Sequence, residues 1–209
     1  MLEEIGNRNF PIWLLGDSPP EKWKRNLEFP LDSRHPIRHN IWTSVLDVIQ
    51  QEVYRHNQKR FNSESVYIRN AISDVGHKPE DNVEEWKPKA IEDFNLYKRL
   101  IRKYKPRLVI TFGALSFEFG RRIMNNKIHL KYKNWDTTEL GNEFKVSIKN
   151  YDRQKTNFIP LLHRSIAGGG FLVSHKNFTG LPNANYFEYV GKEISKLIID
   201  IGMNEPIYL

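Results

Sequence analysis

The chain has 209 residues, which is enough for one ordinary domain. It contains no cysteine, so disulfides, cysteine-ligated zinc, cysteine-held iron–sulfur clusters and thiolate nucleophiles are all excluded. Lys and Arg number 32 against 25 Asp and Glu, and the resulting formal charge of +7 is compatible with a polyanionic partner without identifying one.

A hydrophobic fraction of 39% is sufficient for a folded core. No apolar run approaches the roughly 18 residues that a membrane span needs, and the first residues lack the pattern of a signal peptide. Internal repeats and low-complexity linkers are absent from the sequence as well. We therefore expect a single cytoplasmic domain over residues 1–209, monomeric and not bound to a membrane.

Four short apolar segments, rich in β-branched and aromatic residues, predict strands buried on both faces of a parallel sheet. They span residues 12–15, 66–68, 108–112 and 158–162. Segments with helical periodicity lie between and after them, at 41–53, 91–104, 114–124 and 185–201, and Pro88 suits a first helical turn. This alternation predicts an α/β fold, a three-layer α/β/α domain with a central four-stranded parallel sheet.

One segment departs from the alternation. Phe144, Val146 and Ile148 alternate with polar residues and precede a turn-like sequence at 150–152. This pattern predicts a β-hairpin that leads into the fourth strand.

Ligands of open α/β sheets bind beyond the carboxyl ends of the strands, so the residues that follow each predicted strand carry the functional information. Gly16, Asp17 and Ser18 follow the first strand, Asn70 the second and His163 the fourth. We expect the carboxylate, the carboxamide and the imidazole to converge on one edge of the sheet. Taken singly, each has a structural alternative, since Asp17 and Asn70 fit capping positions and His163 fits a hydrogen-bonded structural role.

Other kinds of site find less support. The sequence has no phosphate-binding GxxxxGK[ST] loop, no GxGxxG after a strand and no GxSxG elbow. The glycines at 168–170 leave a phosphate cradle as a minor alternative. His35 and His39 are the one i, i+4 histidine pair, but Pro36 lies between them and further ligands are missing, so we expect no metal and no cofactor.

The order of these motifs resembles the uracil-DNA glycosylase superfamily over roughly residues 10 to 200. The segments that carry the resemblance are Leu14-Leu15-Gly16-Asp17-Ser18-Pro19-Pro20, then Phe29-Pro30 with His35-Pro36 and Asn40-Ile41-Trp42, then Val66-Tyr67-Ile68-Arg69-Asn70, the stretch from Lys105 to Ala114, and Ile159-Pro160-Leu161-Leu162-His163-Arg164-Ser165. The resemblance implies the superfamily's fold and a partner that is single- or double-stranded DNA.

The resemblance also implies roles for individual residues. Asp17 would position a water and stabilise a cationic sugar, while His163 would donate a hydrogen bond to the departing pyrimidine. Asn70 would read the pyrimidine edge, and Phe29 would stack on the flipped ring. Gly16 and Ser18 would complete the base pocket. Trp42 is an alternative stacking residue, although its pattern also fits the core.

Contacts with DNA are implied for the loop after the second catalytic motif, which spans Ser165 to His175, and for the helix after the third strand. The residues concerned are Arg164, Ser165, Gly169, Phe171, Leu172 and Ser116. Phe171 and Leu172 would fill the gap left by a flipped nucleotide, or alternatively would anchor the loop in the core. A basic stretch with Arg121, Arg122, Lys127, Lys131 and Lys133 is either a further DNA contact or an unstructured insert.

The sequence also departs from the superfamily. The acid stands in the second place of the first motif, as in the branch that carries an iron–sulfur cluster, yet the chain has no cysteine to hold one. Pro20 occupies the place where a Tyr excludes 5-substituted pyrimidines in the best-known branch. The predicted activity is therefore hydrolysis of the N-glycosidic bond of uracil or a 5-modified pyrimidine, including a modified base of phage DNA. The alternatives are a catalytically silent nucleic-acid-binding module and an enzyme that acts on small nucleosides.

Overall fold

The computed structural model describes residues 4–18, 27–35, 37–73, 88–124, 135–163 and 171–209, with Phe171 described in its backbone only. In this part of the chain the strands are β1 (Glu4–Ile5), β2 (Ile12–Gly16), β3 (Tyr67–Asn70), β4 (Leu108–Phe112) and β5 (Asn157–Leu161). The helices are a π-helical turn (Arg38–Trp42) that continues into α1 (Thr43–Asn57), then α2 (Pro88–Tyr104), α3 (Ala114–Ile123), α4 (Thr137–Lys149), α5 (Phe171–Thr179) and α6 (Tyr186–Gly202).

The strands form one mixed, mostly parallel sheet in the order β1-β3-β2-β4-β5. The four predicted strands are confirmed, and they are all parallel. The predicted count of four was one short, because β1 adds an antiparallel strand at the β3 edge. Every residue of β2 and of β4 is buried, as their uninterrupted apolar sequences predict.

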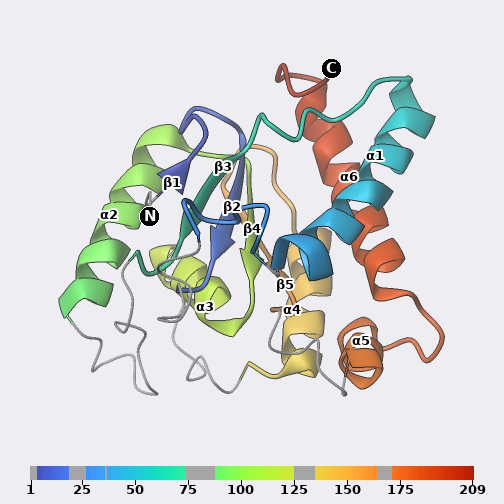
Figure 1. Ribbon diagram of the computed structural model, residues 1–209. Coiled ribbons are helices and arrows are strands. Elements are labelled where there is room, and N and C mark those ends of the chain that lie inside the picture. The colour runs from blue at the N-terminus through green and yellow to red at the C-terminus, as the bar shows by residue number, and fades with distance from the viewer. Residues whose placement is uncertain (1–3, 19–26, 36, 74–87, 125–134, 164–170) are drawn as a thin grey trace.

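Helices cover both faces of the sheet, with α2 and α3 on one side and α1 and α6 on the other (Figure 1). On the first face, Trp13 of β2 contacts Tyr97 of α2, with 5.8 Å between ring centroids. On the second face, Phe112 of β4 meets Trp42 at 6.1 Å. This packing follows from strand alternation, because Trp13 is paired with Val109, and Phe112 lies three positions further along and so points to the opposite side.

The predicted helices are confirmed as α1, α2, α3 and α6, and α2 begins at Pro88 as expected. The apolar spacing of this segment puts Ile91, Phe94, Tyr97, Ile101 and Tyr104 on one face of the predicted helix. Ile91 departs from this prediction, because it is 45% exposed whereas Asp93 is buried. The buried carboxylate of Asp93 is tolerated because it is paired with the guanidinium of Arg69.

The hairpin predicted around Phe144 is wrong, and the segment forms helix α4. Asp136 caps the helix by accepting hydrogen bonds from the backbone N–H groups of Thr138 and Glu139 at 2.8 and 2.9 Å. Leu140 and Phe144 are buried four residues apart. Three alternating apolar positions are too few to distinguish a strand from an amphipathic helix.

Helix α5 also differs from expectation, because the interval up to His175 was predicted as a loop. The helix begins at Phe171, directly after the glycines at 168–170, and it buries His175 and Phe178. The His175 ring stacks on Tyr186 with 4.6 Å between centroids and meets the edge of Phe187 at 5.2 Å. These ring contacts come from α6 and leave no local signal in the sequence. Among all the described helices, none is long and apolar enough to cross a membrane.

Burial of His175 generates a prediction about stability at acidic pH. Desolvation lowers the pKa of His175 from 6.5 to about 4, so the folded protein keeps this ring neutral. The unfolded chain takes up the proton below pH 6.5, whereas the folded chain does so only near pH 4. The free energy of unfolding is therefore expected to fall across this window, by about 2 kcal/mol from this ring.

Urea unfolding of wild type, His175→Phe and the exposed control His56→Phe at pH 7.5 and 4.5 measures this contribution. We expect His175→Phe to lose about 2 kcal/mol less than wild type between the two pH values. His56→Phe is expected to follow wild type. Parallel pH profiles for wild type and His175→Phe would contradict the prediction.

Candidate functional site

The carboxyl ends of the parallel strands meet at one edge of the sheet. Gly16 is in register with Asn70, and Phe112 is in register with Leu161. Asp17 directly follows β2, and His163 comes two residues after the end of β5. The expected placement of the three polar side chains at this edge is confirmed.

Asp17 and His163 face each other across the sheet edge. His163 Nε2 lies 4.0 Å from Asp17 Oδ2, a separation longer than a direct hydrogen bond. The side chain of Asp17 is 9% exposed and that of His163 is 26% exposed. The site therefore has a largely enclosed carboxylate beside an imidazole that solvent or a ligand can reach.

Asn70 lies against the end of β2, because position 16 has no side chain. A Cβ at Gly16 would stand only 2.3 Å from Asn70 Oδ1. The pairing of β2 and β3 continues beyond the strands, since the N–H of Ala71 donates to Gly16 O at 2.9 Å and that of Ile72 to Asp17 O at 3.2 Å. These backbone hydrogen bonds hold the segment after Asn70 against Gly16 and Asp17, and the carboxamide oxygen of Asn70 lies close to Gly16.

His163 is positioned by two contacts that the sequence did not reveal. Gly113, at the end of β4, adopts φ 91° and ψ 180°, a combination reached almost only by glycine, and a Cβ there would lie 2.7 Å from His163 Cβ. The N–H of Leu162 donates to the hydroxyl oxygen of the fully buried Tyr186 at 3.0 Å. Burial raises the pKa of Tyr186, so the hydroxyl stays protonated.

Phe29 is half-buried in a turn organised by the buried carboxylate of Asp32. Asp32 accepts hydrogen bonds from the backbone N–H groups of Glu28 and Arg34 and from the guanidinium of Arg34, at 2.7 to 3.1 Å. These hydrogen bonds hold the pKa of Asp32 well below its usual range. Stacking of Phe29 on a base stays a prediction, whereas Trp42 is buried against Phe112 and has the core role.

The remaining predicted positions are placed as follows. Ser18 is half-buried beside Asp17, while Arg164, Ser165 and Gly169 lie outside the described residues. The backbone of Phe171 opens α5, and Leu172 in the first turn of α5 is 79% exposed. The alternative in which Leu172 anchors the segment in the core is therefore wrong.

Ser116 does not support its predicted DNA contact. Its side chain is fully buried, and its hydroxyl donates to Gly113 O at 3.1 Å within the first turn of α3. The reason is that the first turn of α3 is packed inside the fold, where this hydroxyl satisfies a backbone carbonyl.

The basic stretch is also partly turned inward. Nε of Arg121 and Nε of Arg122 lie 3.1 and 2.8 Å from the carboxylate of Glu118, which also accepts from Trp135 Nε1 at 2.9 Å. Glu118 is fully buried, so these two arginines compensate an internal charge. The predicted lysines of this stretch, Lys127, Lys131 and Lys133, lie outside the described residues.

Comparison of the sequence with models of protein families and with curated proteins yields no match.

Replacement of Gly113 tests how strongly the site depends on backbone geometry. Gly113→Ala is expected to lower the free energy of unfolding by about 2–3 kcal/mol, because it strains the backbone and pushes on His163. Gly180→Ala is the matched control, since Gly180 has φ 67° and its added Cβ would meet only the flexible end of Lys145. For this control we expect a loss of about 1 kcal/mol. Equal losses in chemical denaturation would contradict the prediction.

Proposed function

We propose that this protein is a DNA glycosylase that hydrolyses the N-glycosidic bond of uracil or of a 5-modified pyrimidine. The observation that carries the proposal is the convergence of Asp17, Asn70 and His163 at the carboxyl edge of the sheet. Such a set combines a carboxylate, a hydrogen-bonding imidazole and an amide able to read a base. The order of motifs in the sequence supports the same reaction.

Asp17 is proposed to act on the sugar side of the bond. As the bond between C1′ and the base nitrogen breaks, positive charge develops on the sugar, and a nearby carboxylate stabilises it. The same carboxylate orients a water and accepts its proton while the water oxygen bonds to C1′. The enclosed position of Asp17 strengthens this interaction, because the local dielectric constant is lower than that of water.

His163 is proposed to act on the departing base. The base leaves with the bonding electron pair, and its negative charge is shared with a ring carbonyl oxygen. A hydrogen bond from the partly exposed imidazole to that oxygen lowers the barrier. The base is then protonated by solvent, and the DNA keeps an abasic site.

Asn70 is proposed to recognise the pyrimidine. A carboxamide offers one acceptor oxygen and two donor hydrogens, which matches the mixed edge of uracil. A base must leave the duplex to reach such groups, and Phe29 would stack on the flipped ring. The exposed Leu172 would fill the vacated space in the stack.

Oligonucleotide cleavage tests the proposal. Single- and double-stranded DNA containing uracil, 5-hydroxymethyluracil, 5-hydroxymethylcytosine or its glucosylated form is incubated with the protein, and abasic sites are cut with alkali. We expect strand breaks at one or more of these bases. Asp17→Asn and His163→Ala are each expected to lower the single-turnover rate about a hundredfold or more.

Asp47→Asn is the matched control, because Asp47 is an exposed carboxylate on α1 and the chemical change is the same. This variant is expected to keep the wild-type rate. Binding of all substrates without strand breaks would contradict the proposal and favour a silent nucleic-acid-binding module. Release of bases from free nucleosides alone would instead favour a nucleoside hydrolase.

A further inference from the structure

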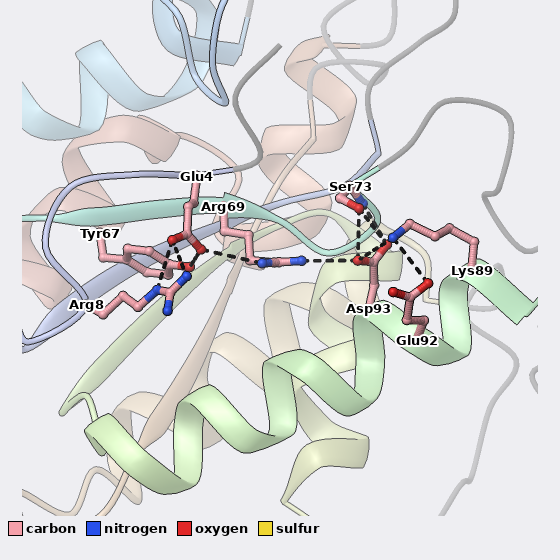
Figure 2. Close-up of polar contacts among 8 residues, drawn as sticks. All are labelled: Glu4, Arg8, Tyr67, Arg69, Ser73, Lys89, Glu92 and Asp93. Atoms are coloured by element: carbon pink, nitrogen blue, oxygen red, sulfur yellow. Dashed lines mark hydrogen bonds and ion pairs between the residues drawn. The ribbon is translucent and has the colours of Figure 1, made fainter.

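A buried ion pair lies directly behind Asn70, on the opposite face of β3. Arg69 Nη2 donates to Asp93 Oδ1 at 3.1 Å, so the pair joins β3 to α2. Asp93 also accepts from the N–H of Ser73 at 2.9 Å and from its hydroxyl at 2.9 and 3.0 Å. We call Arg69, Ser73 and Asp93 the Asp93 clamp; Figure 2 shows its side chains between the strand and the helix.

Burial of the two charges of the clamp has a large desolvation cost. The side chains of Arg69 and Asp93 are each 1% exposed, so both charges are removed from water. A packed hydrophobic pair in the same space is often as stable as a buried ion pair, or more so. A contribution to folding stability is therefore a poor explanation for this ion pair. A role in fixing the geometry of the chain explains it better.

The clamp encloses the segment that carries Asn70. Arg69 precedes Asn70 and Ser73 follows it by three residues, so Asp93 binds the chain on both sides of Asn70. Side chains alternate across a strand, which puts Arg69 on the α2 face and Asn70 on the face of Gly16. Because Arg69 is bound to Asp93, movement of this end of β3 relative to α2 would stretch the ion pair.

The guanidinium is also held at its other end. Arg69 Nη1 lies 3.5 Å from Glu4 Oε2 of β1, and the Tyr67 hydroxyl donates to the same carboxylate oxygen (Figure 2). Arg69 thus bridges two carboxylates from different elements. A planar guanidinium binds carboxylates only in defined orientations. Arg69 therefore fixes the relative orientation of its two partners in addition to balancing their charge.

We propose that Asp93 is a positioning residue that sets the orientation of the Asn70 carboxamide and thereby the selectivity for the pyrimidine edge. This inference rests on the proposed function, because it assigns Asn70 to the base. Asp93 itself does not touch the substrate. Loss of its charge releases Arg69 toward Glu4, and an amide at this position cannot accept from all the groups that Asp93 accepts from now.

A double-mutant cycle measures the coupling. Asp93→Asn is compared in the wild-type and Asn70→Ala backgrounds, using kcat/KM on the pyrimidine that wild type removes fastest. If Asp93 acts through Asn70, we expect Asp93→Asn to lower kcat/KM about tenfold in wild type and less than about twofold in Asn70→Ala. Glu92→Gln, an exposed carboxylate one residue away on α2, is expected to leave kcat/KM unchanged.

A spectroscopic readout tests the positioning without any need for activity. The side-chain amide of Asn70 gives one pair of ¹⁵N–¹H signals, identified by its loss in Asn70→Ala. We expect this pair to be sharp in wild type and Glu92→Gln, and broadened or multiplied in Asp93→Asn. Ser73→Ala, which removes one hydroxyl and keeps the ion pair, serves as the milder variant if Asp93→Asn does not fold.

The two proposals fail in distinguishable ways. A wild-type protein that cleaves no base overturns the proposed function, while the Asn70 signals still test the clamp. A sharp, single Asn70 pair in Asp93→Asn, or in Ser73→Ala if that variant stands in for it, overturns the positioning role. Equal losses of kcat/KM in the two backgrounds overturn it as well, because they show that Asp93 acts independently of Asn70.

Discussion

The parallel pairing of β3, β2, β4 and β5 is the constraint on which the candidate site depends. Backbone hydrogen bonds put the four carboxyl ends at one edge, so polar residues far apart in the chain come within a few ångströms of each other. Asp17 and His163 are separated by 146 positions of sequence and by 4.0 Å in space. The apolar strands carry no chemistry themselves, but their register decides which side chains can act together.

Two clusters of buried charged side chains lie inside this fold, and each charge in them has partners of opposite sign. Arg69 lies between Glu4 and Asp93, and Glu118 lies among two arginines and a tryptophan. Each of these charges would be costly if it were buried alone, and each is tolerated because its partners come from the neighbouring turn or element. At the carboxyl edge, by contrast, His163 keeps access to solvent, which a site for a ligand requires.

Local patterns predicted the regular part of the fold. The four parallel strands and α1, α2, α3 and α6 follow from apolar runs, helical spacing and Pro88. The errors lie where distant contacts override the local pattern. Phe144 belongs to a helix because Asp136 caps it and Gly141 lies against the backbone of Phe178, and α5 gains its buried face from aromatic rings of α6. A two-residue strand such as β1 is too short to leave a periodic signal.

The sequence by itself determined which side chains are available and after which strand along the chain each of them comes. Asp17, Asn70 and His163 were identifiable because residues after buried parallel strands share one edge. Only the tertiary structure decided how these side chains are held. Gly113 makes room for His163, Tyr186 binds the end of β5, and Asp93 binds the chain around Asn70. These contacts join segments distant in sequence, and their energies depend on three-dimensional distances that no local pattern encodes.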